Sequence, residues 1–273
     1  FILGAIVFAV LVGPFLWTLP INEIDFSAKL EGPSCAHPLG TDDHGQDVLA
    51  RLLYGGRISL AVGLCAMLVA CTVGVLIGAI AGMSRGAVDA FLMWLADLFL
   101  SLPTLPLLLL IIYLFRDSLK GVFGPEGGVF VMIVSVIGGL RWMQVARLVR
   151  AQILSIREKE FIEAARALGA SPVRQVVRHI LPNAMAPLLV QGTFVAASAV
   201  LSEAVLSFLG LGLPPDIPTW GNIMAEGRVQ FSLYPEQVLI PAMFLVPTVL
   251  AINVLGDGLR DLLDPKFAAR GRT

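Results

Sequence analysis

The stretch from Arg157 to Asn183, REKEFIEAARALGASPVRQVVRHILPN, carries eight Arg, Lys and Glu side chains in a chain that is otherwise strongly apolar. Of the 273 residues, 57% are hydrophobic and 14% are charged, which is typical of a protein that crosses a membrane several times. The formal net charge of -1 gives no general attraction to nucleic acid, so no nucleic-acid partner is expected. The charged stretch therefore interrupts a polytopic protein surrounded by membrane lipid.

A helix needs roughly 20 apolar residues to cross a bilayer core about 30 Å thick. Runs of this length predict six transmembrane helices, roughly at 1–20, 58–83, 90–115, 128–146, 186–210 and 236–256. The first run begins at Phe1 without an initiator Met or a basic flank, so we expect a longer protein rather than a signal peptide. The sequence predicts an all-α polytopic membrane protein whose single transmembrane domain covers residues 1–273.

Arginine and lysine residues near the ends of membrane spans are retained on the cytoplasmic side. The segments after the second, fourth and sixth expected spans hold thirteen basic residues, at Arg85, from Arg141 to Arg178 and from Arg260 to Arg272, against six elsewhere. We therefore expect both termini in the cytoplasm, segment 21–57 outside, and 147–185 as the largest cytoplasmic loop.

The charged stretch predicts two short amphipathic helices. The first has one face at the i, i+3, i+4, i+7 spacing, formed by Phe161, Ala164, Ala165 and Leu168. Gly169 is expected to end it in a left-handed conformation, and Ser171 with Pro172 to start the next helix. The second helix is expected to bury Val173, Val176, Val177, Ile180 and Leu181. Pro182 is expected to end it before the fifth span.

Two interpretations fit this pair of helices. One places it flat on the membrane, with its apolar side among the lipid headgroups. The other docks it against a protein, because Ala164 and Ala165 form a small-residue face where a lipid-bound helix would usually carry Leu, Phe or Trp. The pattern alone leaves both interpretations open.

The same stretch resembles the EAA motif of ABC importer permeases. The motif is matched in order and spacing by Glu163, Ala164, Ala165, Gly169, Leu181 and Pro182, while His179 stands where the general pattern has Ile. Three more stretches match in order: HPLGTDDHGQDVLARLLYGGRISL from His37, LSFLGLGLPP from Leu206 and GDGLRDLLDP from Gly256. Over residues 37–267 the chain is similar to the second permease subunit of dipeptide, oligopeptide and nickel importers.

This resemblance implies a set of partners in a bacterial inner membrane. They are a homologous second permease subunit, two ABC ATPase subunits and a periplasmic or lipid-anchored solute-binding protein. The loop 147–185 would hold the coupling helix that docks on an ATPase subunit, with Glu163 and Arg166 as polar contacts at its edge. The same motif implies four further coupling residues, Ala164, Ala165, Gly169 and Pro182.

No GxxxxGK[ST] loop for binding nucleotide phosphates occurs in the sequence. We therefore expect no ATP site in this chain, and the resemblance implies no cofactor and no enzymatic activity here, with ATP and Mg bound by the partner ATPase subunits. Short peptides are the expected solute, and nickel, a metal chelate, glutathione or another small solute are alternatives. An ion-coupled secondary transporter is the alternative from another class, but no internal hydropathy repeat supports it.

A charge near the centre of a bilayer costs about 2.5 to 3.5 kcal/mol on insertion scales, so ionisable residues inside spans are functional candidates. Asp97 falls in the third expected span and Glu203 in the fifth. They are expected either to line the translocation pathway or to form hydrogen bonds between packed helices.

The external segment is rich in residues able to bind a metal, namely Cys35, His37, Asp42, Asp43, His44 and Asp47. Their spacing does not match a dedicated site, and no metal is expected. A periplasmic motif of the family instead accounts for His37, Gly40, Thr41, Asp42 and Asp47, with Gln46 in place of the usual Arg. Asp42 or Asp43 is expected to cap a short helix on the membrane surface that contains Val48, Leu49, Leu52 and Leu53.

Overall fold

The computed structural model describes residues 1–84 and 86–263, and the side chains among them outside 116–123 and 125–126. Arg85, the end of the GDGLRDLLDP stretch and the basic residues from Lys266 to Arg272 lie outside the described residues. Over the described part the fold is helical, as the sequence predicts, with a single isolated β-bridge between Thr41 and Asp47.

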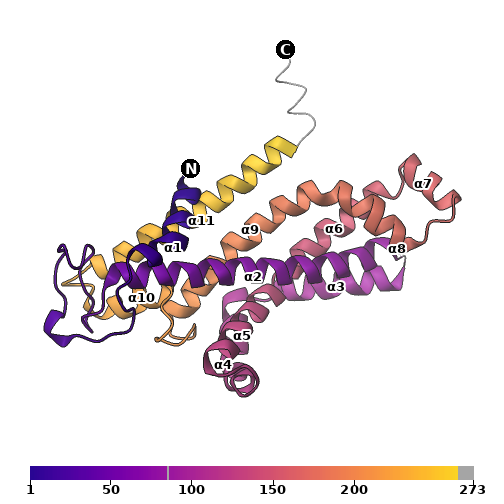
Figure 1. Ribbon diagram of the computed structural model, residues 1–273. Helices are drawn as coiled ribbons and strands as arrows, with labels where there is room; N and C mark the ends of the chain where they lie inside the picture. The colour runs from indigo at the N-terminus through magenta and orange to yellow at the C-terminus, as the bar shows by residue number, and fades with distance from the viewer. Residues whose placement is uncertain (85, 264–273) are drawn as a thin grey trace, which may run out of the picture.

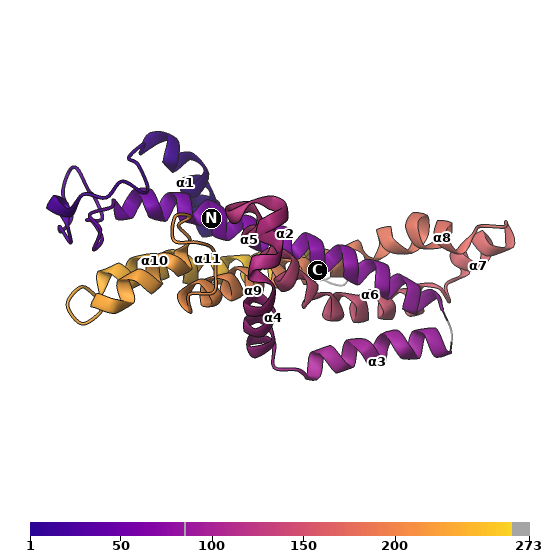
Figure 2. The same cartoon turned by 90° about the horizontal axis from the view of Figure 1, so that it is seen from below.

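The molecule is elongated, with α4 and α5 projecting to one side of its long axis (Figure 1). Its helices are, in order, α1 (Ile2–Leu16), α2 (Val48–Met83), α3 (Ala87–Ser101), α4 (Thr104–Phe123), α5 (Pro125–Gly139), α6 (Trp142–Ile156), α7 (Glu160–Ala167), α8 (Pro172–Gln175), α9 (Leu181–Phe208), α10 (Trp220–Gly227) and α11 (Glu236–Leu263). Both views place the segment before α2 together with α10 at one end, and α7 with α8 at the other (Figures 1 and 2). The charged stretch therefore forms one tip of the bundle.

Helix α2 is the central helix of the bundle. Its 36 residues make a rod of about 54 Å, along which α6 and α9 pack. The helix is capped by Asp47, whose carboxylate accepts a hydrogen bond of 2.6 Å from the Ala50 amide. The expected cap at Asp42 or Asp43 is therefore wrong, because Asp47 stands next to the first helical residue and the helix runs without a break into the second span.

The expected surface helix around Val48 is also not observed. Val48, Leu52 and Leu53 are buried, because this first part of α2 packs against α1 and α10 instead of lying on lipid. Gly56 allows the approach, since a Cβ atom there would lie 2.6 Å from the Val10 side chain.

Contact between α2 and α6 depends on a row of glycines one turn apart, Gly74, Gly78 and Gly82. A Cβ atom on Gly74 would lie 2.5 Å from Val145 Cβ, and one on Gly78 would lie 2.5 Å from the Ala146 carbonyl oxygen. Helices in lipid gain little from burying apolar surface, so their association depends on close packing through small residues. The glycine row therefore fixes how α6, and the loop that follows it, sit on α2.

Two of the expected spans are broken in the structure. In place of one helix over 90–115, α3 and the first part of α4 meet at an angle of 92°. Pro103 causes this break, because proline has no amide hydrogen and disfavours the helical conformation of the residue before it. Around 128–146 the chain bends by 43° between Gly139 and Trp142, where two successive glycines weaken the helix.

By length and composition, three helices of the described chain are able to cross a membrane, or up to five if each bent pair forms one span. The three are α2, the rod over Pro172–Phe208 and α11. Helix α1, in the first expected span, is apolar but has only 15 residues.

Replacing Gly78 with Ala is expected to destabilise the protein, because the new methyl group would overlap the backbone of α6. Overpacking of this kind costs about 1–3 kcal/mol. Gly258→Ala is the matched control, since a Cβ atom there meets nothing within 4 Å and alanine favours helix by up to about 1 kcal/mol. Thermal unfolding of each purified variant in detergent measures the difference. Equal unfolding midpoints for the two variants would show that the glycine row is not a tight contact.

Candidate coupling surface and pathway residues

Helix α7 is attached to the tip of the bundle by one fully buried side chain. Ile162 is 0% exposed and lies in an apolar cluster with Ile153, Ile156 and Ile180. These partners come from the end of α6 and from the segment that leads into α9. The short helix is therefore fixed to both of the long helices on either side of it in the sequence.

The predicted small and apolar face of α7 points away from the bundle. Phe161, Ala164 and Leu168 are exposed, and Ala165 is half-buried. We call these four residues the α7 stripe. Glu163 and Arg166 are exposed as well, and the helical spacing places them on the other side of α7 from the stripe. Because Ile162 provides the attachment, the stripe is left free for a contact outside this chain.

The turn after α7 has the geometry that the sequence predicts. Gly169 has φ of +83°, a conformation that glycine adopts without steric cost. The Ala170 amide donates a hydrogen bond of 3.0 Å to the Ala165 carbonyl, which closes the helix end. Ser171 then caps α8 by accepting from the Arg174 amide at 3.3 Å, and Pro172 is the first helical residue.

Burial in the second helix is only partly as expected. Val176 and Ile180 are buried and Leu181 is half-buried, but Val173 and Val177 are 72% and 61% exposed. The helix rests on the bundle along one narrow side, so these two valines face outward. They enlarge the apolar surface that this tip presents.

Pro182 does not end the helix, contrary to the expectation. A π-helical segment, Val176–Ile180, joins α8 to α9, and the helical rod continues from Pro172 to Phe208. The wider π turn accommodates a residue that lacks an amide hydrogen. The Asn183 side-chain amide donates a hydrogen bond of 2.6 Å to the His179 carbonyl in the same stretch. The coupling loop is therefore continuous with α9.

Two side-chain contacts hold the loop to its neighbours. Arg157 donates a hydrogen bond of 3.0 Å to the Gly82 carbonyl at the end of α2. Gln175 donates one of 2.8 Å to the Ala170 carbonyl across the turn. The tip is thus connected to α2, α6 and α9 together.

Glu203 is fully buried among three helices. Its carboxylate accepts hydrogen bonds from Ser59 of α2 at 3.0 Å and from Ser207 at 2.6 Å. Ser59 in turn accepts from the Trp220 amide at the start of α10, at 3.3 Å. Of the two roles expected for Glu203, this geometry favours helix packing, because the side chain joins α2, α9 and α10 and reaches no open surface.

Asp97 lies in a different environment. It forms an ion pair with Arg147 of α6, and the two side chains are 58% and 48% exposed. A second pair, Asp89 with Arg150, joins the same helices with a distance of 2.5 Å between Oδ1 and Nε. Charged residues inside membrane proteins face water or another protein rather than lipid. The open side of α3 and α6 around Asp97 is therefore a candidate pathway or subunit surface.

The motif that contains His37, Gly40 and Asp47 lies at the opposite end of the molecule. His37 Nδ1 lies 2.9 Å from Asp47 Oδ2, and Trp17 donates a hydrogen bond of 3.0 Å to Asp47 Oδ1. Gly40 has φ of +75°, and a Cβ atom there would lie 2.5 Å from the Glu31 carbonyl oxygen. The capping residue of α2 is thus also the point where the preceding segment is fastened.

Asp42 and Thr41 connect the same segment to α10 and α11. Asp42 pairs at 2.5 Å with buried Arg51, which also contacts Glu226 of α10 at 2.7 Å. The Thr41 carbonyl accepts a hydrogen bond of 2.9 Å from Gln237 of α11. Sequence reasoning missed Arg51, Glu226 and Gln237. A charged residue in the first turns of an apolar helix is the one signal that points to Arg51.

The arrangement gives no support to a metal site. Within the described chain, one group of three ligand atoms lies within 4.8 Å of one another, from Asp42, Asp43 and His44. The Asp42 carboxylate already accepts from Arg51 and from the amides of His44 and Gln46, both at 2.9 Å. A cation would have to compete with a buried arginine for the same oxygens.

Comparison with known proteins identifies the family. Residues 74–269 match the model of the binding-protein-dependent transport system inner membrane component. A putative peptide permease protein of Brucella suis biovar 1 is 41% identical over 97% of this chain and 85% of its own length. The dipeptide transport system permease protein DppC of Alkalihalophilus pseudofirmus is 37% identical over 97% of this chain and 84% of its own.

One further sequence relative and one solved structure are also similar to this chain. The oligopeptide transport system permease protein OppC of Bacillus subtilis is 37% identical over 86% of this chain and 73% of its own length. A chain of the MetNI methionine ABC transporter, solved in inward-facing conformations, superposes with a TM-score of 0.59 over 78% of this chain and 96% of that chain. At 20% identity, that structure supports the fold. On the family match and these relatives, this chain belongs to the inner membrane permease components of binding-protein-dependent transport systems.

Proposed function

We propose that this chain forms half of the translocation pathway of an ABC importer for short peptides. Its partners are a homologous second permease, two ABC ATPase subunits and a periplasmic or lipid-anchored solute-binding protein. The observation that carries the proposal is the α7 stripe, an exposed small and apolar surface on a helix anchored by buried Ile162. A groove on an ATPase subunit is the surface that this helix fits.

The contacts around α7 make it suitable as a lever. A force on the stripe reaches α6 through the Ile162 cluster, and reaches α9 through the unbroken rod over Pro172–Phe208. The glycine row on α2 lets α6 pack directly against that helix. ATP and Mg bind to the ATPase subunits, so this chain contributes conformational change and makes or breaks no bond itself.

Peptides are the proposed solute because the relatives named above are described as peptide, dipeptide and oligopeptide permeases. Nickel or a metal chelate and glutathione are the alternative solutes for the same architecture. Uptake by the reconstituted importer, with its binding protein and a labelled dipeptide, distinguishes among them.

The proposed membrane orientation rests on the proposed docking of α7. Docking on an ATPase subunit places the tip that carries α7 in the cytoplasm, and α10 with segment 21–57 at the periplasmic face of the inner membrane. Both termini are then cytoplasmic, in agreement with the distribution of basic residues.

Ala164→Trp is expected to weaken ATPase binding, because a large ring on the stripe would overfill the groove. We expect the copurified ATPase to fall about tenfold or more, which corresponds to about 1.4 kcal/mol, and solute uptake to fall with it. Ala167→Trp is the matched control, since this residue is exposed on the same helix but lies outside the stripe. Retention of the ATPase and normal uptake in Ala164→Trp would exclude the docking role.

Gly169→Val tests the angle between the two helices. A β-branched residue at positive φ is strained by about 1–3 kcal/mol, while no atom lies within 4 Å of a Cβ atom at this position. We expect normal membrane insertion, with reduced ATPase copurification and uptake. On a lipid-bound loop the same change would leave both measurements unaffected.

Thiol labelling tests the orientation. Cys35 is exposed and becomes the only thiol in a Cys65→Ala, Cys71→Ala background, because the chain has three cysteines. We expect a membrane-impermeant maleimide to label Cys35 in intact cells. Ser155→Cys, with the three native cysteines removed, should label only after permeabilisation. The reverse pattern would overturn the orientation and the coupling argument together.

A further inference from the structure

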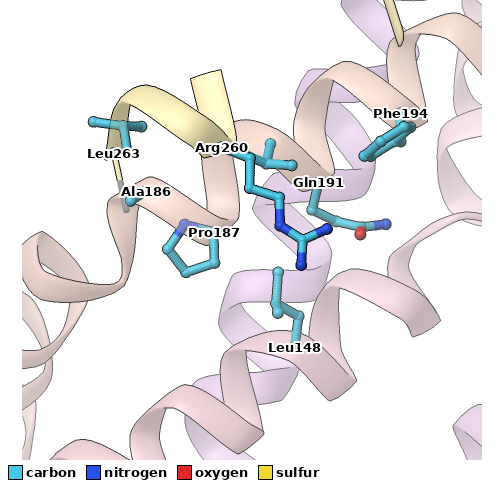
Figure 3. Close-up of a pocket in the computed structure, with 8 residues that line it drawn as sticks. Leu148, Ala186, Pro187, Gln191, Phe194, Arg260 and Leu263 are labelled. Carbon is cyan, nitrogen blue, oxygen red and sulfur yellow. The ribbon is translucent and has the colours of Figure 1, made fainter. Parts of the chain in front are cut away.

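A pocket of about 440 Å³ opens between α6, α9 and α11 near the coupling end of the bundle. Figure 3 shows Arg260 reaching from α11 across its mouth, with the guanidinium between Pro187, Gln191 and Leu148. Phe194, about one turn beyond Gln191 on α9, also lines the pocket. The pocket is therefore an apolar hollow with one cation at its opening.

Arg260 has no partner for its charge among the described side chains, which form no hydrogen bond or ion pair with it. The nearest polar group in the pocket is the Gln191 carboxamide, which donates a weak hydrogen bond of 3.5 Å to Gln144 of α6. Ligand sites are commonly hollows of about 300–1,000 Å³ with apolar walls and a few polar groups. The pocket has the size and composition of such a site.

The surface beside the pocket is not suited to lipid. Gln144, Arg147 and Ser155 are exposed along one side of α6, and Arg147 pairs with half-exposed Asp97. Uncovered polar and charged side chains at membrane depth face water or protein. The pocket thus opens beside a polar face, as expected for a site on a water-filled pathway between two permeases.

We propose that this pocket is a solute site on the cytoplasmic half of the pathway, and that Arg260 binds a carboxylate of the solute. Arginine pairs with carboxylates through two parallel hydrogen bonds. A short peptide has a C-terminal carboxylate next to a side chain, which matches a guanidinium next to apolar walls. The assignment rests on the proposed function, since it names how that solute is held during its passage.

The other solutes considered for this architecture fit the same chemistry in part. Glutathione and organic metal chelates also carry carboxylates, whereas a free metal cation would be repelled by Arg260. The pocket therefore selects for a carboxylate rather than for one peptide sequence.

The first test measures uptake in proteoliposomes that contain the complete importer and its binding protein. Arg260→Gln is expected to reduce uptake of a dipeptide about tenfold or more, because a charge-assisted pair is lost. Arg260→Lys should retain an intermediate rate, and Ala186→Phe, which fills the pocket without changing charge, should also reduce uptake. ATPase copurification and its stimulation by the binding protein should stay unchanged in all three variants. Unchanged uptake, or loss of the ATPase in Arg260→Gln, would overturn the assignment.

The second test detects the solute directly. Phe194 is replaced with p-benzoylphenylalanine and the importer is illuminated with a radiolabelled dipeptide, or with the same dipeptide as its C-terminal amide. We expect crosslinking of the free acid, much less of the amide, and none at the control position Phe91, which is exposed on α3. Equal crosslinking of acid and amide would overturn the role of Arg260.

Two further results identify the anion that Arg260 binds. If wild-type uptake falls to the Arg260→Gln level when anionic lipids are omitted from the vesicles, the anion in the pocket is a lipid headgroup and the proposal fails. If the wild-type importer transports no peptide but takes up another carboxylate, the proposed peptide function fails. The pocket assignment is then tested on that solute: reduced uptake in Arg260→Gln supports it, and unchanged uptake overturns it.

Discussion

The close approach of helices to the glycines of α2 is the constraint on which the rest of the molecule depends. Lipid provides little hydrophobic drive for helices to associate, so contact area and backbone proximity must supply the attraction. Along one rod of 36 residues, Gly56 admits Trp220 of α10, Gly63 admits Val200 of α9, and the row from Gly74 to Gly82 admits α6. Each contact would be prevented by a single methyl group. Because α6 and α9 are the helices that lead into and out of the coupling loop, the position of α7 is determined by these contacts.

The two ends of the rod are stabilised by different chemistry. At the end that carries Asp47, Glu203 with Ser59 and Arg51 with Asp42 form buried polar contacts that join α2 to α9, α10 and the segment before α2. Such contacts have narrow geometric requirements, and they favour one fixed arrangement. At the coupling end, Ile162 rests in an apolar cluster and the stripe beside it is exposed. Apolar packing tolerates small changes of angle more readily than a network of directed hydrogen bonds. The buried polar contacts at the Asp47 end therefore constrain the packing of α2, α9 and α10 narrowly, while at the α7 tip an apolar cluster is joined to α2 by the Arg157 hydrogen bond to the Gly82 carbonyl.

Features that depend on local chemistry could be predicted from the sequence, and those that depend on contacts between distant segments could not. Gly169, Ser171 and Pro172 act through the backbone of their own turn, so the helix end and the next cap were predictable. The break at Pro103 and the continuation past Pro182 show the limit of such rules. Proline ends a helix in one place and is accommodated by a π turn in the other. The Arg51 contacts with Asp42 and Glu226 join residues up to 175 positions apart, and one sequence carries no signal for such a pairing. For the same reason the outward positions of Val173 and Val177 depend on where α6 lies.

The pocket and the proposed coupling surface share two helices, so a movement of the α7 tip would act on the proposed solute site. Leu148 belongs to α6, while Pro187 and Phe194 belong to α9, and both helices end at the α7 tip. Arg260 belongs to α11, which is not part of the loop that connects them. A shift of the tip would therefore move the apolar walls relative to the guanidinium, and the carboxylate and the side chain of a bound solute could no longer be held together. A transport site must bind its solute strongly enough for the solute to enter and weakly enough for it to leave. One arginine at the mouth of an open, mostly apolar hollow meets that requirement, whereas a closed cage of several charges would retain the solute.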